Sequence, residues 1–219
     1  AYIAMNQGRY EDARTHLEKS VKAIADSKEK YASGLISRGE ATLAYVMFLQ
    51  GEYSNSEKLY RKLIVDAEKS QSPYVVSYQY NNLGEVLHAG GRDDEARPLI
   101  QKALDLFVEV KNLRWQAVSL VNLGLIEHSA SQFPAAETYF RRALALYKEI
   151  GDRRGVAEAL NRLGGTVYWY GKYHEAIDLH QKAYDLFTEL GNPKGAADAL
   201  VLCSIAENAV GLYEDGQKH

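Results

Sequence analysis

The chain has 219 residues, of which 46 % are hydrophobic and 25 % charged, a balance typical of a soluble protein with enough apolar material for a core. A net charge of −3 argues against a nucleic-acid-binding protein, and the lack of any apolar run near the roughly 18 to 20 residues of a membrane span argues against a membrane protein. A single cysteine, Cys203, excludes a disulfide framework and a cysteine-based metal site, and it favours a cytoplasmic location.

The secondary structure predicted along the chain is helical throughout, with short turns between the helices. Only four prolines occur, and apolar residues recur at steps of three and four rather than in strict alternation. The first two turns are 43 residues apart and the later ones 40 residues apart; they lie at 8–10, 51–53, 91–93, 131–133, 171–173 and 211–213. A fixed period of this length is typical of a helical repeat array.

Each period is predicted to hold a helical hairpin, for example a first helix at about 114–130 and a second at about 134–150. Small residues recur where the two helices face each other, which allows a close approach. The facing contact is expected at Gly84, Gly124 and Gly164. His180 stands where other repeats have Ile100 and Phe140, so we expect it to be a buried core residue.

Several helix ends are marked in the sequence. Ser72 and Asn192 each precede a proline and are predicted N-caps, whereas Gly151 and Gly191 suit left-handed C-caps. Residues 1–7 are expected to be the tail of a first helix. Tyr213 is expected to begin a second helix that stops at the end of the sequence.

These residues resemble the tetratricopeptide repeat, which has Leu-Gly in its first helix, Gly-x-Tyr at the turn and two alanines in its second helix. Here the pattern is Leu163-Gly164, Gly171-Lys172-Tyr173, Ala176 and Ala183. The 40-residue unit is longer than the usual unit of about 34 residues, and is similar to arrays in kinesin light chain, spindle-orientation adaptors and bacterial STAND regulators. The resemblance implies an all-α, right-handed superhelical solenoid of antiparallel helix pairs.

The organisation predicted from the repeats is one array over 1–219, of about five 40-residue units cut at both ends. Solenoids usually end in polar capping helices, and none is recognisable in the sequence. We therefore expect a fragment of a larger protein whose other domains lie outside this chain.

A concave groove lined by the first helices is the binding site that the resemblance implies. Asn82, Asn122 and Arg162 occupy one position in three successive repeats, and an amide there can both donate to and accept from a peptide backbone. The alternative is that they bridge neighbouring helices. The predicted peptide-binding residues are Tyr78, Asn82, Glu85, His88, Asn122, Leu125, His128, Glu158, Arg162, Tyr168 and Trp169.

Other side chains have competing interpretations. His88 and His128 share a position with Tyr168, but zinc takes three or four converging ligands, so no metal or other cofactor is expected. The aromatic run at 168–170 either clasps an apolar anchor of a partner or packs internally. Arg141 is interpreted as solvated helix surface rather than as a phosphate site.

The sequence shows no P-loop, no G-x-S-x-G and no H-E-x-x-H, and no catalytic group of nucleophile, base and orienting residue, so we expect no enzyme. The leading hypothesis is a protein- or peptide-binding scaffold or sensor that belongs to a larger bacterial signalling or transcriptional regulator. Two alternatives stay open: a solenoid that senses a small molecule near Tyr168 and Trp169, and a module that self-associates through its uncapped ends.

Overall fold

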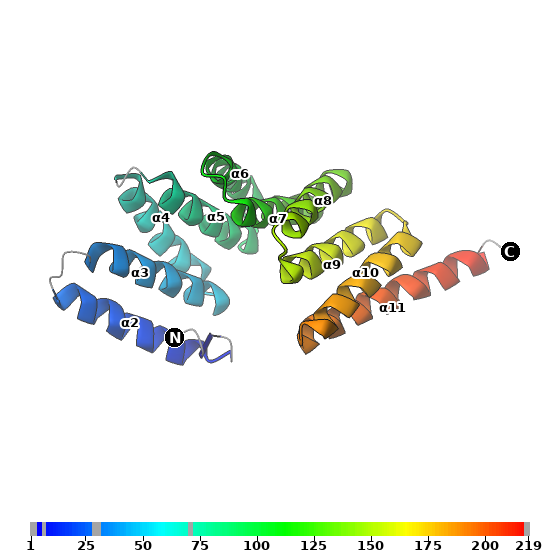
Figure 1. Ribbon diagram of the computed structural model, residues 1–219, viewed down its shortest axis with the longest axis horizontal. Helices are drawn as coiled ribbons and strands as arrows, with labels where there is room; N and C mark the ends of the chain where they lie inside the picture. The colour runs from blue at the N-terminus through cyan, green and yellow to red at the C-terminus, as the bar shows by residue number, and fades with distance from the viewer. Residues whose placement is uncertain (1–3, 6–7, 28–31, 70–71, 217–219) are drawn as a thin grey trace. The chain divides into compact units, whose positions relative to one another are not determined.

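The computed structural model describes residues 4–5, 8–27, 32–69 and 72–216, with side chains described up to position 211. Every regular element in these ranges is an α-helix. The helices, coloured from blue to red along the chain in Figure 1, are α2 (Tyr10–Asp26), α3 (Ala32–Leu49), α4 (Tyr53–Lys69), α5 (Pro73–Ala89), α6 (Asp93–Glu109), α7 (Leu113–Ser129), α8 (Phe133–Glu149), α9 (Arg153–Trp169), α10 (Tyr173–Glu189) and α11 (Pro193–Gly216). The all-α prediction is confirmed, and α7 and α8 lie within one residue of the predicted boundaries.

Two compact units divide the chain, Ala1–Val110 and Lys111–His219. In the first unit each helix from α2 to α5 packs on the next one along the chain, and in the second unit the helices from α7 to α10 do the same. Consecutive helices within a unit run antiparallel (Figure 1). Each unit is therefore built from helical hairpins, as predicted.

The turns inside the hairpins place one residue in the left-handed backbone region. Gly91 and Gly171 both have φ of +74° there. Ser131 stands at the same position of the intervening repeat with φ of +58°, although a residue with a Cβ loses about 1 kcal/mol or more in this conformation. The predicted left-handed caps, Gly151 and Gly191, have φ of +67° and +64°.

The two helices of a hairpin approach most closely at the glycine of the Leu-Gly pair. In three hairpins a Cβ on this glycine would overlap the side chain that faces it: Gly84 with Ile100 at 2.3 Å, Gly124 with Phe140 at 2.7 Å, and Gly164 with His180 at 2.8 Å. Real Cβ atoms do not come this close to their neighbours, so any larger residue at these positions would force the facing side chain or the helices to move. The predicted facing contact is confirmed.

His180 is a core residue, as predicted. Its side chain is only 1 % exposed, and its Nδ1 lies 2.7 Å from Oδ1 of Asn161. Burial lowers the pKa of His180 to about 4, so the imidazole is neutral near pH 7.

Side-chain N-caps recur with the repeat. Asn112, Asp152 and Asn192 each accept a hydrogen bond from the backbone N–H three residues later, at 3.3, 3.1 and 3.0 Å. The predicted cap at Asn192 is confirmed. Ser72 occupies the N-cap position ahead of Pro73, but its side chain makes no capping hydrogen bond.

The C-terminal prediction was wrong. α11 runs without a break from Pro193 to Gly216, through the turn expected at 211–213. The turns upstream need φ near +70° at their glycine, and Gly211 does not have a positive φ. At the other end, Ala4 and Met5 are helical, and the rest of 1–7 that could test the predicted helix tail lies outside the described residues.

Candidate functional site

The predicted binding residues of the first unit lie along α5. Tyr78, Asn82, Glu85 and His88 follow one another at steps of four and three, so they share one face of the helix, and all four are half-buried. The ring of Tyr78 packs edge-on against Phe107, with centroids 5.2 Å apart.

Polar contacts on this face of α5 are largely internal. Asn82 lies close to the hydroxyl of Tyr60 on α4, and this hydroxyl donates a hydrogen bond to the backbone carbonyl of Ala41 at 3.2 Å. Nδ1 of His88 lies 2.6 Å from the carboxylate of Asp93. Burial raises the pKa of Glu85, and the nearby His88 opposes this shift. Among the described residues Glu85 is the one member of the α5 group that has no hydrogen-bond partner.

The predicted residues of the second unit lie on α7 and α9. Asn122 is 9 % exposed, whereas Leu125 and His128 are half-buried. Burial lowers the pKa of His128, and the positive charge of Arg162 lowers it further. His128 on α7 and Arg162 on α9 therefore lie near each other, and they repel each other when His128 is charged.

On α9 the predicted residues Glu158, Arg162 and Trp169 are exposed, and the half-buried Gly165 lies between them at steps of four, three and four. We call these four residues the α9 inner strip. Tyr168, which is also predicted, is half-buried. Glu158 pairs with Arg154 one turn earlier at 3.0 Å, and Arg162 is exposed. Gly165 is bare, because a Cβ built on it would meet no atom within 4 Å. The strip thus offers a cation, an aromatic ring and open space between them.

Trp169 belongs to a cluster of aromatic rings at the end of α9. It stacks on Phe133, with centroids 6.2 Å apart and planes at 5°, and meets Tyr168 edge-on at 5.7 Å. Phe133 also contacts Tyr170, and Tyr168 contacts Tyr173. Trp169 is nevertheless 62 % exposed, so the cluster supports this ring without covering it.

Phe133 and Tyr173 are not among the residues predicted from the sequence. The signal for them is a contact repeated in each hairpin, between the last turn of the first helix and the first residue of the second. The pairs are Phe48 with Tyr53, His88 with Asp93, His128 with Phe133, and Tyr168 with Tyr173. The two residue types of each pair change together from repeat to repeat. Their contact therefore joins the two helices of the hairpin, in addition to any contact with a partner.

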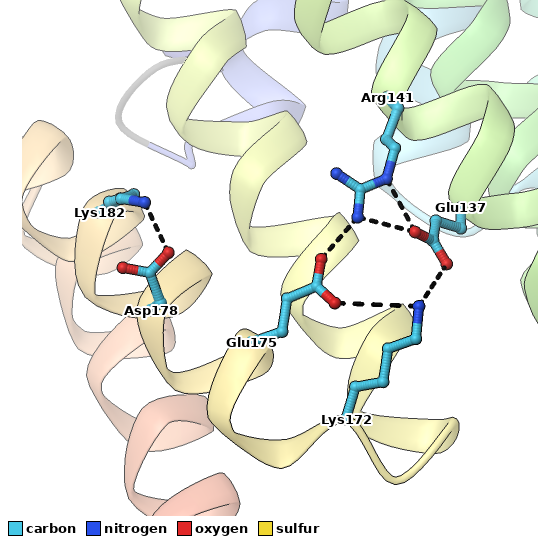
Figure 2. Close-up of polar contacts among 6 residues, drawn as sticks. All are labelled: Glu137, Arg141, Lys172, Glu175, Asp178 and Lys182. Carbon is cyan, nitrogen blue, oxygen red and sulfur yellow. Dashed lines mark hydrogen bonds and ion pairs between the residues drawn. The ribbon is translucent and has the colours of Figure 1, made fainter.

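The second helices carry a four-membered ring of charges in each unit. In Figure 2, Arg141 contacts Glu137 at 2.8 Å and Glu175 at 2.5 Å, while Lys172 contacts the same two carboxylates at 3.4 and 3.9 Å. Although burial opposes it, Arg141 holds the pKa of Glu137 below its usual value. Eighty residues earlier, Arg61 and Arg92 make the same contacts with Glu57 and Glu95. Arg141 is thus engaged with carboxylates rather than open to a phosphate.

Within the described ranges, no group of three or more His, Cys, Asp or Glu side chains is placed to hold a metal ion. The same residues include no helix that is both long enough and apolar enough to cross a membrane.

Comparison with known proteins supports the repeat. A model of the tetratricopeptide repeat family matches residues 75–149. This segment is a tetratricopeptide-repeat array. The α9–α10 pair that follows continues the same spacing, turn and glycine contact, and solved structures of this architecture match nearly the whole chain, so the fold of the whole described chain is of the tetratricopeptide type.

Solved structures with the tetratricopeptide fold resemble nearly the whole chain. BtubC (BKLC) from P. vanneervenii is 20 % identical with a TM-score of 0.78, over 95 % of this chain and 87 % of that one. A STAND protein with a tetratricopeptide repeat sensor from Pyrococcus horikoshii is 18 % identical with a TM-score of 0.76, over 94 % of this chain and 31 % of that one.

A third structure is PlcR from Bacillus thuringiensis in complex with the peptide PapR7 and DNA, at 15 % identity and a TM-score of 0.75, over 92 % of this chain and 70 % of PlcR. A comparison with curated protein sequences gave no significant match. At these identities the structures establish the tetratricopeptide fold alone.

Proposed function

We propose that this chain is a protein- or peptide-binding scaffold or sensor module of a larger bacterial signalling or transcriptional regulator, located in the cytoplasm. It binds its partner and does not catalyse a reaction. In the second unit the partner lies along the α9 inner strip, with Asn122, Leu125, His128 and Tyr168 beside it. In the first unit Tyr78, Asn82, Glu85 and His88 form the corresponding contacts on α5.

The exposure of Trp169 is the observation that carries this proposal. A tryptophan that is 62 % exposed while stacked on Phe133 presents a large apolar surface in a fixed orientation. Rigid aromatic side chains of this kind dominate binding hot spots, because they bury much area and lose little conformational entropy. Arg162, two turns earlier on the same strip, adds a donor for carboxylate or carbonyl oxygens.

Proteins of similar fold support a binding role. PlcR, in the complex named above, holds a peptide, and the Pyrococcus horikoshii protein uses its tetratricopeptide repeats as a sensor. The contacts of the α9 inner strip suit the same class of ligand, since an extended peptide offers both backbone amides and apolar side chains.

The experiment is a selection of displayed twelve-residue random peptides on the immobilised chain, followed by affinity measurements on the enriched sequences. Replacing Arg162 and Trp169 by alanine should weaken binding at least tenfold, because the main apolar contact and a charged donor are both removed. Arg142→Ala, an exposed arginine on α8, is the matched control and should change affinity less than twofold. Equal affinities for the chain and the Arg162/Trp169 variant would place the partner elsewhere.

A small-molecule ligand near Tyr168 and Trp169 is separated from a peptide by a thermal-shift screen. If a metabolite raises the melting temperature of the chain and the peptide selection enriches no sequence, the result favours a role as a small-molecule sensor.

Self-association through α11 is a second candidate, favoured by its exposed apolar side chains. Leu200, Val201 and Ile205 are 48 %, 59 % and 44 % exposed. The equivalent residues of α9, Leu160 and Asn161, face α10. Light scattering should report a larger particle that returns to monomer mass when Leu200 and Val201 are replaced by lysine, and a monomer at all concentrations would exclude this candidate.

A further inference from the structure

The second unit has a concave surface on the side of α9 opposite the α9 inner strip. We call it the outer groove. It is an open hollow between α8 and α10, with α9 as its floor, and its volume is about 490 Å³. Its apolar lining consists of Leu144, Val156, Leu160, Leu163, Leu179 and Leu186. A groove of this size, lined mainly by apolar side chains, is within the range of ligand sites.

The rims of the outer groove are mostly basic. Arg141 and Lys148 line it from α8, and Lys182 and Asp185 line it from α10. Arg141 is engaged in the charge ring, and Lys182 pairs with Asp178 one turn away on its own helix at 2.5 Å (Figure 2). Asp185 accepts a hydrogen bond from Gln181 at 2.9 Å.

Lys148 has no ion-pair partner within the part of the chain that the structure describes. It stands on the rim opposite Lys182, across a floor of leucines. Two lysines facing each other over apolar surface attract a ligand that carries negative charge and apolar groups together.

The first unit has the same groove with different residues, and its volume there is smaller, about 270 Å³. Eighty residues earlier, the positions of Lys148, Leu160 and Lys182 hold Glu68, Tyr80 and Lys102. The Tyr80 hydroxyl donates a hydrogen bond to Glu68 and accepts one from Lys102 at 2.5 Å. Lys102 also lies 4.1 Å from the Tyr80 ring centroid. An acid, an aromatic ring and a lysine thus span this groove from α4 to α6.

We infer that the outer groove of the second unit binds a peptide segment of a partner protein in which leucine-like side chains are flanked by Asp or Glu. The apolar side chains pack on the half-buried Leu144, Val156 and Leu186. Between these residues lies the buried floor at Leu160, where the first unit places Tyr80. The carboxylates lie between Lys148 and Lys182 and supply the negative charge that Glu68 supplies in the first unit. Leu160 and Leu163 point away from Arg162 and Trp169 around α9, so this site is independent of the α9 inner strip.

The test uses a pool of fluorescein-labelled twelve-residue peptides with two central leucines and Asp or Glu at the flanking positions. The matched pool has Asn and Gln instead. Anisotropy should show saturable binding of the acidic pool, at least tenfold weaker binding of the amide pool, and weakening by salt. In a sample with ¹³C-labelled leucine methyls, the acidic pool should shift the signals of Leu160, Leu163 and Leu179 and leave that of Leu123 in place.

The decisive variant is Lys148→Glu with Leu160→Tyr, because it installs the residues that bridge and narrow the groove in the first unit, and it should fold. It should weaken binding of the acidic pool at least tenfold. Lys194→Glu, the same charge change at an exposed residue of α11, should alter affinity less than threefold. Arg162→Ala with Trp169→Ala should leave this binding unchanged, so failure here and failure of the proposed function are distinguishable.

Three results would overturn the inference. One is no saturable binding of the acidic pool. Another is equal binding by the Lys148→Glu/Leu160→Tyr variant, with circular dichroism showing that this variant is folded. The third is a set of leucine methyl shifts produced by sodium dodecanoate but not by the peptides, which would assign the groove to an anionic amphiphile.

Discussion

Ser131 carries a side chain where the turns at Gly91 and Gly171 have none, and its φ of +58° is unfavourable for an L-residue. Ser131→Gly should therefore stabilise the chain by roughly 0.5 to 1 kcal/mol, the relief of strain less the greater entropy of glycine in the unfolded state. Urea unfolding at pH 7 measures the change. The reverse substitution, Gly171→Ser, should destabilise by a similar amount, and no change in either variant would show that the turn relaxes freely.

His180 makes the stability of the second unit depend on pH. Burial lowers its folded-state pKa to about 4 from the ordinary value of 6.5, so the unfolded chain takes up a proton first as pH falls. Stability is therefore complete above about pH 6.5 and declines between pH 6.5 and 4, by about 2 to 3 kcal/mol for this group.

Replacing the His180–Asn161 pair by Phe and Val copies Phe140 and Val121 of the preceding repeat and should remove this decline. The measurement is the difference in unfolding free energy between the chain and the double variant at pH 7 and pH 4.5. Carboxylates titrate in both proteins and cancel in the difference. A difference that does not change with pH would show that His180 is accessible to protons in the folded state.

At the scale of the element, α9 presents adjacent glycines with opposite requirements. A Cβ on Gly164 would lie 2.8 Å from His180, whereas a Cβ on Gly165 meets nothing within 4 Å. Gly164→Ala should therefore destabilise by about 1 to 3 kcal/mol through overpacking, and Gly165→Ala should stabilise by up to about 1 kcal/mol through helix propensity. Thermal unfolding followed by circular dichroism compares the two, and effects of the same sign would contradict the assigned orientation of α9.

Much of each helix pair is predictable because the repeat imposes the same packing in every period. The Leu-Gly contact, the left-handed glycines and the buried His180 all follow from spacing. The continuous α11 does not follow from spacing, because Gly211 has no positive φ and the turn motif at 211–213 is helical. Gly155 has the sequence context of a turn but lies inside α9, where a Cβ would come within 2.4 Å of the Tyr147 ring.

The candidate site is less predictable, since side chains on it contact each other across helices. The sequence places Asn82 on the predicted peptide-binding face, but its proximity to the Tyr60 hydroxyl depends on a residue 22 positions earlier that no motif marks. Likewise, Phe133 belongs to a turn by its spacing, and only the fold shows that it supports Trp169.

At the scale of the whole molecule, a period of 80 residues accompanies the period of 40. The charge rings recur at 80, as do the hydrogen bonds of Gln101 with Asp105 and of Gln181 with Asp185. Each unit thus repeats these contacts on its outer surface, whereas other surface residues differ between the two units. The differences, Glu68 against Lys148 and His88 against Tyr168, coincide with the surfaces that we assign to partners.

The central claim is that a peptide lies along the α9 inner strip, over the open space at Gly165. The most direct test is the affinity of the best selected peptide for Gly165→Leu, measured by fluorescence anisotropy beside a melting curve. The variant should bind at least tenfold more weakly while melting at or above the temperature of the unmodified chain, because leucine fills the space without a clash and favours helix. Unchanged affinity in this folded variant would contradict the claim.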